Sequence, residues 1–201
     1  VSFQREGVFT PEELAGRLAE AEQVLCIVNT RKRARQVYES LPEEGRFHLS
    51  TLMIPTDREE TLNVIRARLR NGQVCRVVST SLVEAGVDVD FPSVWRELAG
   101  LDSILQAAGR CNREGKRSAA ESVVHVFEEE GDPPHSMIQQ REAATEVMGE
   151  FEEINTRPAI RAYFNRLLWV KGDDALDARQ ILNGERACTF RKTAEAFCLI
   201  D

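Results

Sequence analysis

The sequence has few of the residues that stabilise small secreted proteins or anchor proteins in membranes. Its five cysteines are an odd number, and none belongs to a Cys-x-x-Cys pair, which argues against a disulfide framework and a zinc site. No apolar run approaches the ~18 residues of a membrane span. The N-terminus has no basic segment followed by an apolar core, so we expect no signal peptide. These absences predict a protein of a reducing cytoplasm with no membrane partner.

The motifs that hold nucleotides and catalytic metals are also missing. A P-loop needs Gly-x-x-x-x-Gly-Lys-Ser/Thr, but the single Gly-Lys pair is Gly115-Lys116, followed by Arg117. No Asp-Glu dipeptide is present to hold magnesium, and no His-Asp dipeptide is present for a metal nuclease centre. The three histidines are scattered along the chain, so we expect no metal site in it.

The net charge of −7 is unevenly distributed. Residues 1–120 hold 17 Lys/Arg and 17 Asp/Glu, whereas residues 121–201 hold 9 and 16. This balance excludes a chain-wide basic surface for nucleic acid, so any such contact must be a local patch in the first part. The acidic second part is expected to be a solvated helical face or a surface for another protein.

Helical and strand patterns alternate through the first 127 residues. Short apolar runs separated by helices of about 10–15 residues indicate an α/β fold, with a mostly parallel sheet covered by helices on both faces. We expect a first domain at 1–130 and a helical appendage at 131–201, beyond the linker 128–134. The expected strands are Val24–Val28, 47–49, Val74–Ser79, Val94–Leu98 and Val123–Phe127.

Local signals set the expected helix boundaries. Thr10 and Glu13 form a capping box around Pro11, and Thr56 with Glu59 is expected to form another. A helix from 102 or 103 is expected to continue to about Asn112. In the appendage we expect helices at about 136–148, 158–169, 175–182 and 191–199, packed against the first domain. The apolar side chains that should then be buried are Leu167, Leu168, Trp169, Phe190, Phe197 and Leu199.

The strongest chemical motif is the run from Gln106 to Arg113, which has the pattern Gln-x-x-Gly-Arg-x-x-Arg. On a helix, Gln106, Arg110 and Arg113 would share one face, because they are spaced by four and three residues. Two guanidinium groups and an amide on one face suit a triphosphate, since the cations neutralise developing charge and the amide orients water. The alternative is a solvated basic face.

Two further motifs follow expected strands. Ser79 and Thr80 end a buried strand, and Gly86 and Asp88 follow in a turn. Hydroxyl and backbone N–H groups at a strand end can hold a nucleic-acid phosphate, and Asp88 could accept a hydrogen bond from a ribose hydroxyl. The alternative is an ordinary strand end and turn. Asn29-Thr30 follows the expected strand Val24–Val28. The alternative to a functional role for this pair is a plain helix cap.

The order of these three blocks resembles motifs IV, V and VI of superfamily 2 helicases. In detail, the residues within these motifs are similar to those of the CRISPR-associated helicase-nuclease of type I interference systems. The resemblance covers about residues 20–128, and Phe190–Phe197 is loosely similar to the family's linker beyond the core. The runs that carry it are Ile27–Thr30, Leu49–Met53, Val83–Pro92 and Leu101–Gly115.

The resemblance implies a second RecA-like domain whose motifs act together with a first one. Gln106, Arg110 and Arg113 would reach ATP and magnesium held mainly by that first domain, with Gly86 and Asp88 also at the nucleotide. Single-stranded DNA would contact four residues of motifs IV and V. These are Asn29, Thr30, Ser79 and Thr80.

The resemblance implies further partners, and this sequence differs from the family's usual residues at two positions. An RNA-guided surveillance complex would recruit the whole enzyme to degrade invader DNA in a bacterial or archaeal cytoplasm, with the nuclease's divalent metal bound outside this chain. The family usually has Gln where Ser81 stands and often Arg where Leu52 stands. The chain alone should be inactive as an ATPase. The alternative function is a catalytically silent interaction module, whose acidic helical tail docks a surveillance complex or a protein inhibitor.

Overall fold

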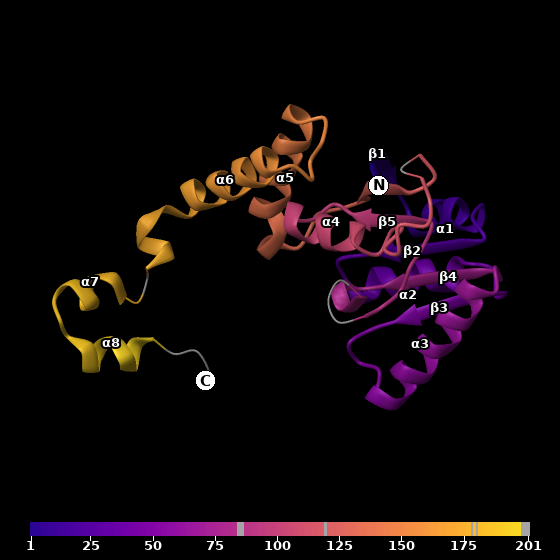
Figure 1. Cartoon of the computed structure of the whole chain (residues 1–201), viewed down its shortest axis with the longest axis horizontal. Coiled ribbons are helices and arrows are strands. Elements are labelled where there is room, and N and C mark those ends of the chain that lie inside the picture. The colour runs from indigo at the N-terminus through magenta and orange to yellow at the C-terminus, as the bar shows by residue number, and fades with distance from the viewer. Residues whose placement is uncertain (84–86, 119, 178, 180, 198–201) are drawn as a thin grey trace.

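A six-stranded parallel sheet forms the centre of the protein (Figure 1). The computed structural model describes residues 1–83, 87–118, 120–177, 179 and 181–197. The strand order is β1-β6-β5-β2-β4-β3, and every neighbouring pair is parallel. The strands are β1 Ser2–Phe9, β2 Gln23–Ile27, β3 Arg46–Leu49, β4 Cys75–Ser79, β5 Ser93–Glu97 and β6 Val123–Glu129.

The expected parallel sheet is confirmed, with one strand more than the sequence patterns predicted. All five expected strands are present within a residue or two of their predicted ends, whereas β1 was not predicted. The helices are α1 Pro11–Ala19, α2 Arg31–Ser40, α3 Pro55–Arg70, α4 Leu101–Ala108, α5 Ile138–Glu150, α6 Arg157–Leu176, α7 Ile181–Arg186 and α8 Phe190–Ala196, with short 3-10 helices η1 Ser81–Val83 and η2 His135–Met137.

Two hydrophobic clusters lie on opposite faces of the sheet. Along β2, Leu25 and Ile27 belong to the cluster that contains α3, and Val24 and Cys26 belong to the cluster that contains α1 and α2. This alternation follows from the two-residue period of a strand. Because both faces are covered by helices, the strand ends are the part of the sheet left to carry chemistry.

The two predicted capping boxes have different outcomes. At α1, the Thr10 hydroxyl accepts from the Glu13 N–H at 3.2 Å and the Glu13 carboxylate accepts from the Thr10 N–H at 2.9 Å, as expected. The expected box at Thr56 and Glu59 is wrong. Helix α3 begins two residues earlier, at Pro55, and its N-cap is Ile54 without a side-chain hydrogen bond. Proline is favoured at the first helical position because its φ is already helical.

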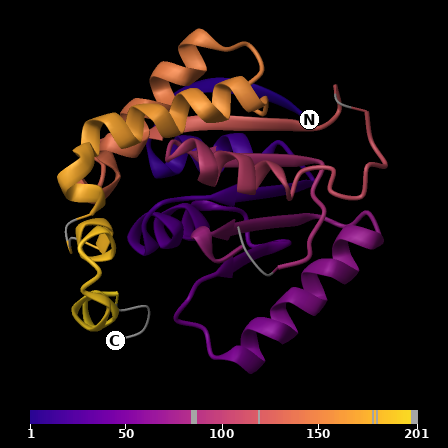
Figure 2. The same ribbon diagram turned by 60° about the vertical axis from the view of Figure 1, so that its left-hand side comes forward.

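Helices α5 and α6 partly fulfil the expectation that the appendage packs on the first domain. A third cluster joins Leu101 and Ile104 of α4 and Val126 of β6 to Val147 of α5 and Tyr163 of α6. Figures 1 and 2 show α5 and the first part of α6 lying over the β6 and α4 end of the sheet. The first half of the appendage therefore shares a core with the sheet.

The second half of the appendage does not pack as expected. In both views α7 and α8 lie apart from the sheet (Figures 1 and 2). Gly172 has a φ of 69°, which breaks the helical path within α6. Leu167 is partly buried, whereas four of the side chains expected to be buried are exposed, and Leu199 lies outside the described residues. The exposed ones are Leu168 (47%), Trp169 (85%), Phe190 (68%) and Phe197 (56%).

Within the described residues, no helix has both the length and the apolar character needed to cross a bilayer. Over the same residues, no group of three His, Cys, Asp or Glu side chains is placed to hold a metal ion. Cys26, Cys75 and Cys111 are free and buried. Burial raises the pKa of all three thiols, to about 12 for Cys75 and about 11 for Cys111. These thiols therefore act as small apolar side chains.

Candidate functional site

The loops of motifs IV and V lie side by side at the carboxyl ends of β2 and β4. Ile27 pairs with Ser79 in the parallel register. Just beyond, the Val28 N–H donates to the Ser79 carbonyl at 2.9 Å. Asn29-Thr30 and Thr80 therefore follow neighbouring strand ends at one rim of the sheet, which confirms their expected placement.

The Ser79 side chain faces the protein interior. It is fully buried, and its hydroxyl donates to the Thr80 carbonyl at 2.9 Å. A phosphate at the surface could not reach that hydroxyl in this structure, so the expected contact between Ser79 and DNA has no support here. Thr80 is also largely buried, with 7% of its surface exposed.

Thr30 acts as the N-cap of α2. Its hydroxyl oxygen accepts from the Arg33 N–H at 3.2 Å. The plain helix-cap interpretation is therefore correct for Thr30. The role is compatible with a further contact, because a hydroxyl that accepts one hydrogen bond still has a proton to donate.

Asn29 is held by residues that the sequence analysis did not assign to the site. Its amide nitrogen donates to a Glu97 carboxylate oxygen at 2.6 Å and to the Leu98 carbonyl at 2.9 Å. Its amide oxygen accepts from Arg96 at 2.7 Å. The signal for this network is the charged pair Arg96-Glu97 inside the apolar run of β5, since charged residues are rarely buried without a partner.

The motif VI residues do not share one helical face, so this expectation is wrong. Helix α4 ends at Ala108. Beyond it, Cys111 forms a parallel bridge with Phe91, in which the Phe91 N–H donates to the Arg110 carbonyl at 2.9 Å. Asn112 then has a φ of 49°. The bridge turns the chain away from the helix axis, so Gln106 lies exposed on α4 while the two arginines lie in the following turn.

Arg110 is buried, contrary to its expected place at the nucleotide. Only 9% of its surface is exposed, and its Nε donates to the Val83 carbonyl at 2.8 Å. Val83 belongs to η1, directly after the motif V strand and Thr80. The Arg110 side chain therefore joins the motif V loop to the motif VI turn.

Arg113 and Asp88 are brought together at the surface. The Arg113 Nε lies 3.0 Å from an Asp88 carboxylate oxygen, and their side chains are 43% and 78% exposed. Two other carboxylates are engaged elsewhere, because Glu114 pairs with Lys116 and Glu97 binds Asn29. Gly86, the other expected nucleotide-binding residue, lies outside the described residues.

A set of hydrogen bonds holds the turn that carries Arg113. The Arg113 N–H donates to the Asp90 carboxylate at 2.7 Å, and Arg117 pairs with the same carboxylate at 3.1 Å. The Asn112 side chain donates to the Arg117 carbonyl at 2.7 Å and accepts from the Arg117 N–H at 2.9 Å. The backbone at Arg113 is thereby fixed while its side chain remains half-exposed.

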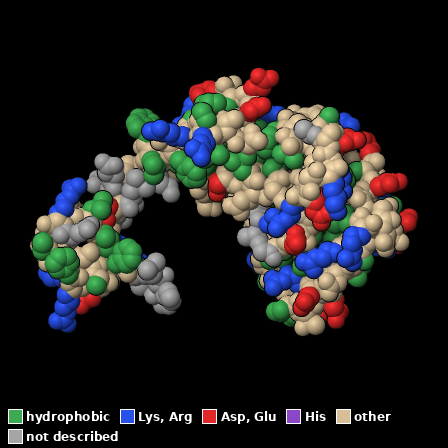
Figure 3. Space-filling model, viewed as in Figure 1, with side chains coloured by type: hydrophobic (Ala, Val, Ile, Leu, Met, Phe, Trp, Pro, Cys, Tyr) green, Lys and Arg blue, Asp and Glu red, His purple; other side chains and the backbone are tan. Residues whose placement is uncertain are grey.

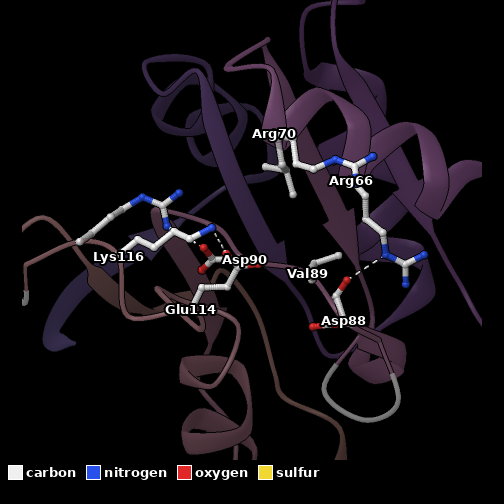
Figure 4. Close-up of a pocket in the computed structure, with 9 residues that line it drawn as sticks. Arg66, Arg70, Asp88, Val89, Asp90, Glu114 and Lys116 are labelled. Atoms are coloured by element: carbon white, nitrogen blue, oxygen red, sulfur yellow. Dashed lines mark hydrogen bonds and ion pairs between the residues drawn. The ribbon is translucent and has the colours of Figure 1, made fainter.

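This turn borders a polar cavity of about 440 Å³. Figure 4 shows Arg66 extending from α3 toward Asp88, with Arg70 on the same helix and Asp90, Glu114 and Lys116 on the other side of the cavity. The Arg66 Nε donates to the Asp88 carbonyl at 3.0 Å. In the space-filling view, Lys and Arg side chains gather with a few acidic ones over this part of the sheet domain (Figure 3). Because basic and acidic residues are equal in number over residues 1–120, an anion can bind there only at a local basic patch. Arg66, Arg70, Lys116 and Arg117 form such a patch at this site.

Comparisons with known proteins agree with this arrangement. A family profile described as "CRISPR-associated nuclease/helicase Cas3, C-terminal" matches residues 20–116. The CRISPR-associated helicase Cas3 of Thermoproteus tenax is 27% identical over 139 residues, which cover 69% of this chain and 23% of that protein. This chain therefore spans about a quarter of the length of that relative.

Solved structures share the fold. The crystal structure of T. fusca Cas3-ATP matches 98% of this chain and 26% of its own, with 16% identity and a TM-score of 0.65. A chain of the "CRISPR RNA-guided surveillance complex, pre-nicking" matches 98% of this chain and 28% of its own, with 17% identity and a TM-score of 0.60. Profile, relative and fold agree with the motif order, and residues 20–116 are similar to the C-terminal part of the CRISPR-associated nuclease/helicase family.

Proposed function

We propose that this chain supplies the second RecA-like domain of an ATP-driven enzyme that moves along single-stranded DNA and degrades invader DNA. The observation that carries the proposal is Arg113, a half-exposed cation on a rigid turn beside Asp88. The nuclease/helicase name of the family supports the class of reaction. In the complete enzyme, ATP and magnesium would be held mainly by the first RecA-like domain.

Arg113 is the residue proposed to act on the nucleotide. When bound, ATP supplies the phosphoryl group whose transfer to water drives movement. The Arg113 guanidinium would exchange the Asp88 carboxylate for a phosphate oxygen and neutralise the charge that develops there. Asp88 would then be free to accept from a ribose hydroxyl. Gln106 is exposed on α4 and remains a candidate for orienting water.

The structure suggests a different role for Arg110. Because its Nε donates to Val83, Arg110 couples the motif VI turn to the loop that follows Thr80. We infer that it transmits a change at the nucleotide to the DNA-facing rim. Thr30 and Thr80 at that rim are the proposed contacts for DNA phosphates.

Substitution of Arg113 in the complete enzyme tests the proposal. Arg113→Ala should reduce DNA-stimulated ATP hydrolysis by about 10³-fold or more, as loss of an arginine finger does. ATP binding and thermal stability should change little, because the side chain is half-exposed. Arg113→Lys is the matched control, because lysine keeps the positive charge but lacks the planar guanidinium group. Turnover of Arg113→Ala within about tenfold of the natural enzyme would assign Arg113 a structural role only.

The isolated chain is predicted to have no ATPase activity. It lacks a P-loop to hold the β-phosphate, and its net charge of −7 opposes binding to DNA. We expect weak binding to single-stranded DNA that disappears at physiological salt. Tight binding with a steep dependence on salt would show that the DNA groove is placed wrongly.

The alternative, an interaction module, is favoured by the exposed apolar side chains of the appendage. Trp169 is 85% exposed and Phe190 is 68% exposed. Such side chains in a helical segment are common at protein interfaces. If the appendage docks the RNA-guided surveillance complex, Trp169→Ser should weaken binding of the complete enzyme to the purified complex while leaving its DNA-stimulated ATPase unchanged.

A further inference from the structure

Asn29 has no hydrogen-bond donor left for a phosphate. Its backbone N–H donates to one Glu97 carboxylate oxygen at 2.8 Å, and its side-chain nitrogen donates to the other at 2.6 Å. The remaining side-chain proton is directed to the Leu98 carbonyl, 2.9 Å away. An amide nitrogen carries two protons, so the donors of Asn29 are all used within the protein. A phosphate, which only accepts hydrogen bonds, has nothing to take from this side chain.

Glu97 is the centre of this arrangement. It lies at the carboxyl end of β5 and is fully buried. Burial raises the pKa of its carboxyl group, while the Asn29 N–H and Arg96 act in the opposite direction. A buried carboxylate is costly unless hydrogen bonds and nearby cations compensate it. The two hydrogen bonds from Asn29 are therefore a condition for keeping Glu97 charged in the interior.

The cluster also reaches the appendage. Arg141 of α5 is 7% exposed, and its Nη1 atom lies 4.0 Å from a Glu97 carboxylate oxygen. Its Nη2 atom donates to Glu128 at 3.3 Å. Arg96 donates to the Glu97 carbonyl and to the Asn29 amide oxygen, both at 2.7 Å. One buried cluster thus connects the β2–α2 loop, the end of β5 and helix α5.

We propose that Asn29 and Glu97 are positioning residues, which hold the β2–α2 loop so that Thr30 faces DNA while Asn29 itself makes no hydrogen bond to DNA. This inference rests on the proposed function, because it assumes that DNA passes this rim. It deepens that function by assigning Asn29 a hydrogen bond to Glu97 within the protein, in place of a direct contact with DNA. The cluster also makes the loop position depend on α5, through Arg141.

A reciprocal exchange of the two side chains tests the proposal. Asn29→Asp would place two carboxylates against each other, and Glu97→Gln would leave one of the two Asn29 donors facing an amide N–H in place of a carboxylate oxygen. The double variant restores a donor and acceptor pair, because the introduced glutamine amide can donate to the introduced aspartate carboxylate. It also keeps one negative charge near Arg96 and Arg141. A direct contact between Asn29 and a DNA phosphate could not survive this exchange, because a carboxylate repels phosphate.

The measurement is ATP hydrolysis by the complete enzyme as a function of single-stranded DNA concentration. We expect each single variant to raise the half-saturating DNA concentration by about tenfold or more, with a smaller change in kcat, since a hydrogen bond to a buried charged group is lost. The double variant should return to within about threefold of the natural enzyme, as coupled neighbours do. Glu12→Gln, on the exposed first turn of α1, is the matched control.

Three results would overturn the inference. The first is a double variant that binds DNA no better than the worse single variant, which would mean that the Asn29 amide contacts DNA itself. The second is an unchanged half-saturating concentration in both single variants. The third is a fall in kcat alone. Failure of the proposed function would look different, because the natural enzyme itself would then show no DNA-stimulated hydrolysis. Thermal melting of all five proteins shows whether each is folded, and recovery in the double variant excludes unfolding as the cause.

Discussion

The Nε atom of Arg113 lies 3.0 Å from a carboxylate oxygen of Asp88, and both side chains are open to solvent. Exposed ion pairs contribute about 0–1 kcal/mol to stability. Water and salt can therefore replace either partner at little cost. This pairing keeps a cation at the surface without fixing it there, and the proposed function requires Arg113 to change partners in this way.

The first prediction is that this pair is dispensable for folding. Asp88→Asn should lower the free energy of unfolding of the chain by less than about 1 kcal/mol, and Arg113→Ala likewise. Urea denaturation of both variants and of the double variant measures this. A loss of about 2 kcal/mol or more from either substitution would mean that the pair is structural.

The second prediction separates the two motif VI arginines. Arg110→Ala should destabilise the chain by about 1–3 kcal/mol, because it removes a buried donor and leaves the Val83 carbonyl without that partner. Loss of activity in Arg110→Ala should therefore come with a lower melting temperature, whereas Arg113→Ala should lose activity with an unchanged one. Equal melting temperatures for the two variants would contradict this separation.

The third prediction concerns the contact between the appendage and the sheet domain. The Tyr163 hydroxyl donates to Asp102 at 2.8 Å, and the side chain is 1% exposed. Tyr163→Phe should cost about 1 kcal/mol by loss of this hydrogen bond, and Tyr163→Ala about 3–5 kcal/mol by loss of the buried ring. Trp169→Ala on the same helix is the control, since its exposed ring should contribute within about 0.5 kcal/mol.

The fourth prediction is a dependence of stability on pH through His48. Burial, and secondarily the charge of Arg35, lower the pKa of His48 below its usual 6.5. In the described structure its Nε2 atom is buried without a hydrogen-bond partner. The unfolded chain therefore binds the proton more readily than the folded chain. The contribution to stability is complete above the unfolded pKa and is lost as pH falls through that value toward the folded one.

Urea denaturation at two pH values checks this prediction. From about pH 8 to about pH 5, the midpoint of the natural chain should fall more than that of His48→Asn, which has no imidazole to titrate. Parallel changes in the two proteins would show that His48 binds its proton equally well in both states.

The sheet could be predicted because most of its strands are buried on both faces. Such strands are apolar runs, as in Val24–Val28, and can be recognised without knowledge of the rest of the fold. The edge strand β1 could not be predicted in this way, because it is not buried on both faces. Most of its side chains are at least partly exposed, so its sequence alternates weakly and includes Gly7. The residue types of an exposed edge strand differ little from those of a loop, so the sequence does not distinguish the two.

The place of the candidate site could be predicted, but its contacts could not. Parallel strands bring their carboxyl ends to one rim, which put Asn29 and Thr80 together before any contact was known. The partners of Asn29 depend on a carboxylate distant in sequence, and no local pattern encodes that pairing. The early end of α4 likewise depends on the bridge between Cys111 and Phe91, a tertiary contact that overrides the helical preference of the run.

Parallel pairing of the first and last strands has a consequence for synthesis on the ribosome. Ser2 pairs with Val123, so β1 has no neighbour in the sheet until β6 has been made. At roughly 5–20 residues per second, β1 waits on the order of 6–24 s after it is translated. The remaining strands can meanwhile assemble around β2, which pairs with both β4 and β5. We therefore expect the nascent sheet to form from its centre outward, with β1 among the last strands to be incorporated.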